Sequence, residues 1–214
     1  MMNIAIIGAT GKAGSVILKE AADRGHKVTA IVRNASKLED KSLNTLEKDV
    51  FDLTAEDVKA FDVVVNAFGA PAGKENLHVE VGQALINILK DAPNTRMIVV
   101  GGAGSLFTDE SKTLRVFESP GFPDAYKATA TNQGQNLQDL QASSGIQWTF
   151  LSPAGFFNPE GVRTGKYQAG NDVILVNSEG NSYISYADYA IALVDEIENP
   201  QHKNERFTVV GEVK

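Results

Sequence analysis

Residues 3–14 read Asn-Ile-Ala-Ile-Ile-Gly-Ala-Thr-Gly-Lys-Ala-Gly, and this stretch decides the fold. It runs as a short apolar strand into Gly8-x-x-Gly11-x-x-Gly14, and an amphipathic segment then continues to Gly25. A second apolar strand, Lys27–Val32, closes a βαβ unit of about 30 residues. A strand, a glycine-rich turn and a helix in this order are typical of a dinucleotide-binding unit.

The glycines have a chemical reason. A pyrophosphate would lie against the first turn of the helix, where unpaired N–H groups and the helix dipole favour negative charge. Side chains at Gly8 and Gly11 would hold the pyrophosphate away, and Gly14 lets the helix pack closely on the strand. We therefore predict a cofactor-binding loop that consists of Gly8, Ala9, Thr10, Gly11, Lys12, Ala13 and Gly14.

The end of the second strand indicates which nucleotide binds. An NAD site usually ends this strand with Asp or Glu, which binds the ribose hydroxyls. Here the strand ends in Val32-Arg33-Asn34, so Arg33 could bind a 2′-phosphate, with help from Ser36 or Lys37. Arg33 could also be an ordinary solvated residue. The pattern favours NADP(H) over NAD(H).

Composition excludes several classes of protein. The chain has 214 residues, 43% of them hydrophobic, and a net charge of −7, which argues against a nucleic-acid-binding surface. It has no cysteine, which excludes thiolate catalysis, and its three histidines are too far apart to suggest a metal site. No segment approaches the length of a membrane span, and the chain opens on a core strand, so we expect a cytoplasmic protein.

Strands and helices alternate along the chain, which predicts an α/β fold with a doubly wound, mostly parallel Rossmann sheet and helices on both faces. We expect one domain over residues 1–214, in which residues 153–185 form a small C-terminal lobe on the substrate side, and an irregular flap over 106–124. A capping box, Ser185–Asp188, opens the last helix. Further strands are predicted at 43–47, 61–66, 96–100, 147–151 and 206–210, and further helices at 76–90 and 125–142.

Ligands of such sheets lie outside the carboxyl ends of the strands, where the strand order reverses. This rule selects residues by position alone. Asp49 could accept a hydrogen bond from the adenine amine, or it could simply cap a helix. By the same rule the cofactor site includes Val50 after the third strand, Ala67, Phe68 and Gly69 after the fourth, Gly102 after the fifth and Pro153 after the sixth.

The chain resembles the atypical short-chain dehydrogenases/reductases, and more narrowly the NADH-flavin reductase family, which is related to the biliverdin-IXβ/flavin reductases and the NmrA-like proteins. The resemblance covers essentially the full length. It rests on Gly8–Gly14, Val32-Arg33-Asn34, Trp148–Ala154, Phe156–Tyr167 and Ile184–Tyr189. It implies NADP(H) at Gly8–Gly14 and Arg33, with a flat acceptor stacked on the nicotinamide.

One departure from the wider superfamily affects the chemistry. Catalytic members use a Tyr that donates a proton and a Lys four residues later that lowers its pKa. Tyr126 is the candidate here, but its lysine is the adjacent Lys127, and Ala130 stands four residues on. Adjacent helical residues diverge by roughly 100° and cannot share such a site. Tyr126, His78 and Ser105 remain weak catalytic candidates, and Phe107, Phe156 and Phe157 are possible pocket residues.

Flavin reduction needs little acid–base machinery, so the leading hypothesis is an oxidoreductase that transfers hydride from NADPH to a flavin or a similarly flat, quinone-like acceptor. FMN or FAD would be a dissociable substrate. The alternative is a catalytically silent NADP(H) sensor of the NmrA-like type, which would act through a protein partner. A sugar-nucleotide epimerase is disfavoured. We expect no nucleic-acid, membrane or metal ligand, and a homodimer is possible.

Overall fold

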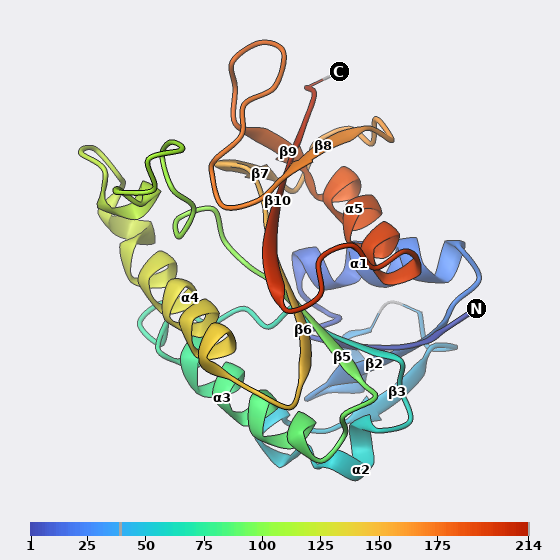
Figure 1. Cartoon of the computed structure of the whole chain (residues 1–214). Coiled ribbons are helices and arrows are strands. Elements are labelled where there is room, and N and C mark those ends of the chain that lie inside the picture. Colours follow the sequence, from blue (N-terminus) through green and yellow to red (C-terminus); the bar gives the residue numbers. More distant parts are fainter. Residues whose placement is uncertain (39, 214) are drawn as a thin grey trace.

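A parallel sheet forms the centre of the computed structural model, which describes residues 1–38 and 40–213. Within these residues, eight strands form one sheet in the order β3-β2-β1-β4-β5-β6-β10-β8 (Figure 1). The prediction of a mostly parallel α/β sheet is confirmed. The strands are β1 Asn3–Ile7, β2 Lys27–Val32, β3 Asn44–Glu47, β4 Val63–Asn66, β5 Arg96–Val100, β6 Gln147–Ser152, β8 Tyr167–Gly170 and β10 Glu205–Gly211.

The strand order reverses next to β1. β1 pairs in parallel with β2 on one side and with β4 on the other. The chain first builds outward to β3, then crosses back to β4 and builds toward β6 and β10 on the opposite side. In sheets of this kind the ligand lies at the carboxyl ends of the strands beside the reversal.

Helices cover both faces of the sheet, as predicted. α1 (Lys12–Asp23) packs on α5 (Tyr186–Glu198) on one face, and α3 (Leu77–Lys90) packs on α4 (Asp124–Ala142) on the other (Figure 1). Short helical turns complete the helical elements of the described residues: α2 Ala55–Val58, η1 Ala35–Lys37, η2 Val50–Asp52 and η3 Val116–Glu118.

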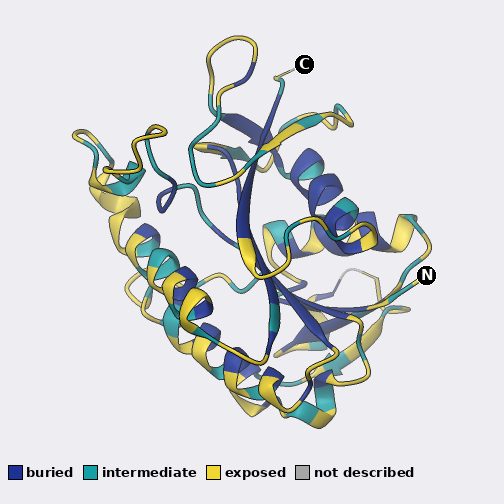
Figure 2. Cartoon of the chain, viewed as in Figure 1, coloured by how far each residue is buried: buried dark blue, intermediate teal, exposed yellow. Residues whose placement is uncertain are grey.

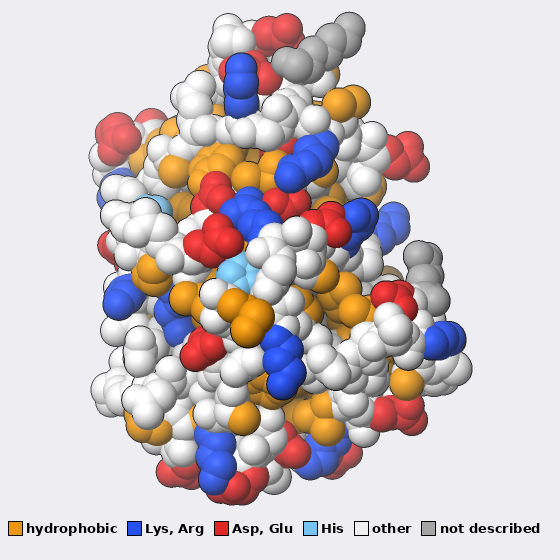
Figure 3. Space-filling model, turned by 90° about the vertical axis from the view of Figure 1, so that its right-hand side faces the viewer, with side chains coloured by type: hydrophobic (Ala, Val, Ile, Leu, Met, Phe, Trp, Pro, Cys, Tyr) orange, Lys and Arg blue, Asp and Glu red, His pale blue; other side chains and the backbone are white. Residues whose placement is uncertain are grey.

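Alternation along the strands assigns side chains to the two faces. Ile4 and Ile6 of β1 pack in the core beneath α1 and α5, whereas Ala5 and Ile7 pack in the core beneath α3. The central strands are therefore buried on both sides, which agrees with their nearly continuous apolar sequences (Figure 2). The outer face over α1 and α5 carries interleaved positive and negative side chains (Figure 3); among its ion pairs, Arg24 contacts Asp195 at 2.6 Å.

Residues 153–185 contain strands that the sequence pattern did not predict. β7 (Phe156–Asn158) pairs in parallel with β9 (Tyr183–Ser185), and β8 pairs antiparallel with β10 at the edge of the main sheet. The predicted capping box is wrong in one half. Ser185 Oγ accepts the Asp188 N–H at 3.0 Å, but the buried Asp188 carboxylate accepts the N–H groups of Thr164 and Gly165 instead. Asp188 thus organises the turn that leads into β8.

A buried arginine holds the flap to the lobe. Arg206 of β10 donates to Asp172 Oδ1 at 2.9 and 2.8 Å and to Ser105 Oγ at 3.1 Å. Phe107 forms an isolated β-bridge with Val173, which joins the flap to the lobe, and a second one with Arg115 inside the flap. Among the described residues, no helix combines the length and apolarity that crossing a bilayer requires.

Candidate functional site

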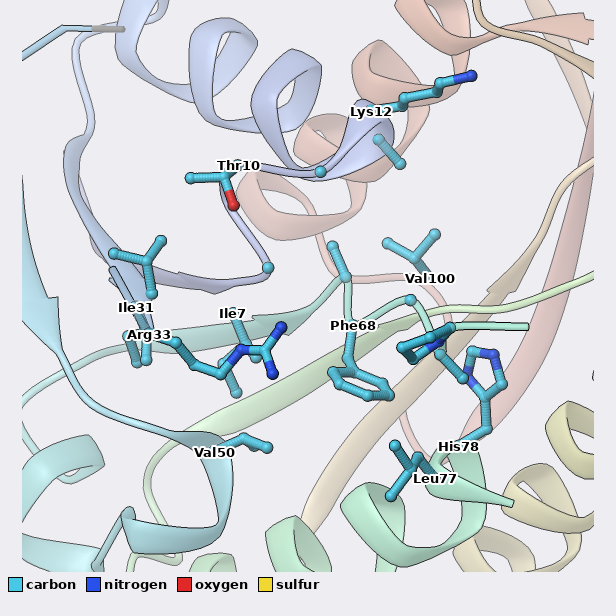
Figure 4. Close-up of a pocket in the computed structure, with 18 of the residues that line it drawn as sticks. Ile7, Thr10, Lys12, Ile31, Arg33, Val50, Phe68, Leu77, His78 and Val100 are labelled. Carbon is cyan, nitrogen blue, oxygen red and sulfur yellow. The ribbon is translucent and has the colours of Figure 1, made fainter. Parts of the chain in front are cut away.

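A pocket of about 560 Å³ lies at the carboxyl ends of the strands beside β1 (Figure 4). It extends from the ends of β2 and β3, across the glycine-rich loop, to the ends of β4 and β5. This is the place that the strand-order rule predicts. Its lining is Ile7, Gly8, Thr10, Gly11, Lys12, Ala13, Ile31, Val32, Arg33, Lys48, Asp49, Val50, Phe51, Ala67, Phe68, Gly69, Ala70, Pro71, Lys74, Leu77, His78, Val100, Gly101, Thr129, Gln133, Phe157 and Tyr186.

The glycine-rich loop is fixed by its own backbone contacts. Gly8 has φ +76°, and a Cβ at this position would lie 2.5 Å from the carbonyl oxygen of Ala67. A Cβ on Gly14 would overlap the carbonyl oxygen of Gly8. Gly8 and Gly14 are therefore needed for close approach of the loop to β4 and of α1 to the loop. Neither Gly14 nor Ala9, which is 2% exposed, lines the pocket. Both residues are buried on the side of the loop that faces away from the pocket.

One end of the pocket carries groups suited to adenosine and its phosphate. The Arg33 side chain points into the pocket from the end of β2 (Figure 4). Asp49 caps η2, because its side chain accepts the Phe51 N–H at 3.0 Å. The structure thus shows the capping role of Asp49, and its contact with adenine stays a prediction. Nearby Lys48 is paired with Asp57 at 2.7 Å.

The other end is built around Phe68 and His78. Phe68 lies between Arg33 and His78 along the pocket (Figure 4). His78 is 8% exposed, and its ring meets that of Phe68 edge to face, with 5.9 Å between the ring centroids. Burial lowers the pKa of His78, which nearby Glu75 offsets only in part. The imidazole is therefore neutral at pH 7, because its ordinary pKa of 6.5 is already below that pH.

Side chains from the lobe and α5 form an aromatic wall. The ring centroids of Phe157 and Tyr186 lie 3.8 Å apart at an interplanar angle of 36°. Burial raises the pKa of Tyr186, so its phenol stays protonated over the physiological range. Phe157 was a possible pocket residue from the sequence, whereas Tyr186 was not assigned to the pocket. Thr129 and Gln133 of α4 face the same end and were also missed.

The structure does not bring every predicted residue to the pocket, and two catalytic candidates are corrected. Tyr126 is 65% exposed at the start of α4 and lies outside the pocket lining. Ser105 is 2% exposed because it packs beneath the flap, where its hydroxyl accepts the Arg206 hydrogen bond. Neither side chain therefore lines the pocket.

Two predicted cofactor residues also lie outside the lining. The Cα of Gly102 is covered by the side chain of Gln133, which itself lines the pocket. Pro153 is buried where β6 ends, and the chain then turns into β7, so that Phe157 reaches the pocket instead. Sequence position therefore identified loops that line the pocket, but not which of their residues do so.

A dinucleotide fits this pocket on three physical grounds. The volume lies within the usual range of small-molecule sites. Lys12 and Ala13 line it from the first turn of α1, where backbone N–H groups favour phosphate. The lining contains four lysine and arginine side chains but a single carboxylate, that of Asp49, in a chain of net charge −7. The surplus of positive charge is therefore local to the pocket.

A doubly wound parallel sheet with this loop and pocket defines a nicotinamide-dinucleotide-binding protein of the Rossmann class. Comparison with known sequences agrees: the chain belongs to the NAD(P)H-binding family, whose sequence profile matches residues 8–200. The chain is 66% identical over 213 residues to the uncharacterized protein YwnB of Bacillus subtilis (strain 168), with 100% of both chains covered.

A solved structure and a more distant relative point to reductases. The crystal structure of SP1627, a putative NADH-flavin reductase from Streptococcus pneumoniae TIGR4, has 42% identity to this chain and a TM-score of 0.94, and the match covers 99% of this chain and 100% of that one. The NAD(P)H azoreductase of Xenophilus azovorans is 23% identical over 211 residues, with 97% of this chain and 68% of the azoreductase covered. The resemblance to the NADH-flavin reductase family is confirmed, and the chain is an NAD(P)H-binding protein of an oxidoreductase family.

Proposed function

We propose that this protein transfers hydride from NADPH to a flavin or a similarly flat, electron-poor acceptor. The observation that carries the proposal is one continuous pocket with a phosphate-binding loop and Arg33 at one end and an aromatic wall at the other. The similarity to an NADH-flavin reductase supports the same class of reaction.

NADPH is favoured over NADH by the end of β2. Arg33 occupies the position where an NAD-specific site usually has a carboxylate, and its guanidinium can bind a 2′-phosphate through two parallel hydrogen bonds. Gly8, Thr10, Gly11, Lys12 and Ala13 would surround the pyrophosphate. Ala67, Phe68 and Gly69 leave space beside the loop, since a Cβ on Gly69 would meet no protein atom within 4 Å.

The acceptor end suits a reaction that needs orientation more than proton transfer. When bound in its reduced form, the nicotinamide would supply a hydride, that is, two electrons and one hydrogen nucleus. Phe157 and Tyr186 would hold a flat acceptor against the nicotinamide. Such positioning matters because hydride transfer requires the acceptor ring and the nicotinamide ring to approach to about 3–3.5 Å. His78 would donate or accept a hydrogen bond at the edge of the acceptor, and solvent can supply the remaining proton.

We also propose that residues 153–185 form the acceptor-side lobe of a single domain. Phe157 of β7 reaches the pocket, and Asp188, which holds the turn after Thr164, lies in the same first turn of α5 as Tyr186. The lobe would therefore position both members of the aromatic wall.

The decisive experiment follows the oxidation of NADPH and NADH by the purified protein, with and without added FMN. We expect rapid oxidation that requires the flavin and is faster with NADPH. Tight NADPH binding without turnover across flavins and quinones would contradict the proposal and favour a cofactor sensor. Stoichiometric flavin retained through gel filtration would contradict a dissociable acceptor.

A further inference from the structure

At the end of the pocket opposite Arg33, a buried polar ring lacks a protein partner. His78 is 8% exposed as a whole residue and lines the pocket. Its backbone N–H donates to the Glu75 carbonyl at 3.1 Å, but its ring makes no hydrogen bond to any of the described residues. The ring nitrogens of His78 face the pocket without a partner among those residues, so a polar atom of a ligand at this position would be able to pair with one of them.

A lysine lies one turn before this histidine. The Leu77 N–H donates to the Lys74 carbonyl at 3.0 Å, so the chain is already turning helically ahead of α3. Lys74 is exposed and lines the same pocket. The remaining lining at this end contains no carboxylate: it consists of Ala70, Pro71, Leu77, Thr129, Gln133, Phe157 and Tyr186. Lys74 is therefore the charged side chain among these lining residues; the carboxylate of Glu75 acts on His78 but does not line the pocket.

The cofactor does not account for this charge. Its phosphates would be bound by the glycine-rich loop, which follows β1, and by Arg33, which follows β2. Lys74 belongs to the β4–α3 connection beside Leu77 and His78, which lie at the opposite end of the pocket from Arg33 (Figure 4). The nicotinamide that would reach this end is uncharged when reduced. A negative group that pairs with Lys74 would then come from the acceptor.

We propose that the acceptor is a flat ring system that carries an anionic substituent such as a phosphate, and that Lys74 binds this substituent while the polar edge of the ring reaches His78. The inference rests on the proposed function and narrows it, because it names the chemical class of the acceptor. A lysine ammonium binds phosphate as a point charge with three donors and needs no fixed geometry, which suits a flexible substituent at the rim of a pocket.

FMN and riboflavin provide the test, since they share one ring system and differ by a phosphate. We would measure kcat/KM for each flavin with saturating NADPH. In parallel, we would titrate each flavin with the NADP⁺-saturated protein and follow flavin fluorescence, which reports binding without turnover. The variants are Lys74→Gln and the control Lys90→Gln, an exposed lysine at the other end of α3.

The wild-type protein is expected to prefer FMN by about tenfold in both measurements, the size of a hydrogen bond to a charged group. Lys74→Gln should remove this preference by weakening FMN alone, and Lys90→Gln should leave it unchanged. The preference should also shrink as salt is raised, because the lysine is exposed.

Equal binding of FMN and riboflavin by the wild-type protein, or an FMN preference that survives Lys74→Gln, would overturn the inference. Equal kcat/KM for FMN and riboflavin would overturn the inference about the anionic substituent but would leave the proposed reductase function intact. Conversely, Lys74-dependent FMN binding without any oxidation of NADPH would support the anionic ligand and contradict the reductase function.

Discussion

The two ends of the pocket are built in different ways. At the proposed cofactor end, the backbone of the loop from Gly8 to Ala13 would form most of the site, and side chains mainly have to be absent. At the acceptor end, Phe68, His78, Phe157 and Tyr186 come from four separate elements and must meet in space. We therefore expect the cofactor end to tolerate little change in backbone conformation and the acceptor end to tolerate little change in side-chain identity.

Gly8→Ala should have the largest effect. The added Cβ would lie 2.5 Å from the Ala67 carbonyl, and the residue would have to keep φ +76°. We expect the free energy of unfolding to fall by about 3 kcal/mol, which is the cost of a non-glycine residue in the left-handed conformation together with the cost of overpacking. We also expect NADPH binding to be lost. Thermal unfolding and NADPH titration measure both.

Gly134→Ala on α4 is the matched control, because a Cβ there makes only ordinary contact with Ser105 Cβ at 3.5 Å. It should leave stability unchanged or raise it by up to about 1 kcal/mol through helix propensity. Wild-type affinity for NADPH in Gly8→Ala would show that the close approach of the loop to β4 is not required for binding.

Arg33→Asp should invert the coenzyme preference. The change removes a guanidinium and places a carboxylate where an NAD site has one, so we expect NADPH affinity to fall by about 100-fold while NADH affinity is kept or rises. Titration with both coenzymes measures the effect, and NADH serves as the internal control. An equal loss for both coenzymes would mean that Arg33 does not bind the 2′-phosphate.

His78→Asn should raise KM for the acceptor by about tenfold and leave NADPH affinity unchanged, because His78 lies at the acceptor end and loses one hydrogen bond. A loss of NADPH affinity of the same size would place His78 at the cofactor instead.

The same residue predicts a dependence of stability on pH. Burial lowers the pKa of His78 in the folded state below 6.5, so the unfolded chain takes up a proton first as the pH falls. The contribution of neutral His78 to stability is therefore present above pH 6.5 and is lost as the pH falls from 6.5 through the folded-state pKa. Stability measured between pH 7 and 5 should fall less steeply for His78→Asn than for the wild-type protein.

Tyr126→Phe should have the smallest effect. The tyrosine is 65% exposed and lies outside the pocket, so kcat and KM should stay within about twofold of the wild-type values, and stability within about 0.5 kcal/mol. A drop in kcat of tenfold or more would restore Tyr126 as a proton donor and would require movement of the start of α4. Steady-state kinetics with NADPH and FMN decide the point.

The fold could largely be predicted because its signals are local. The run Phe61–Asn66 is apolar enough to identify the buried strand β4, and the spacing of Leu77, Val81 and Leu85 identifies α3. Strands β7 and β9 escaped prediction because each has three residues, too few for a periodicity, and their pairing is nonlocal. Asp188 likewise fits a local capping pattern, but contacts with Thr164 determine its role.

The sequence by itself determined the cofactor loop and the position of Arg33, because a tight turn that binds phosphate depends on consecutive residues and on one strand end. Only the tertiary structure decided the acceptor end. In the folded chain, Tyr186 contacts Phe157, and Lys74 lines the pocket near His78. Ser105 lies beneath the flap, where it is hydrogen-bonded to Arg206. The physical reason is that backbone geometry is encoded by near neighbours, whereas the meeting of side chains from distant elements depends on how those elements pack.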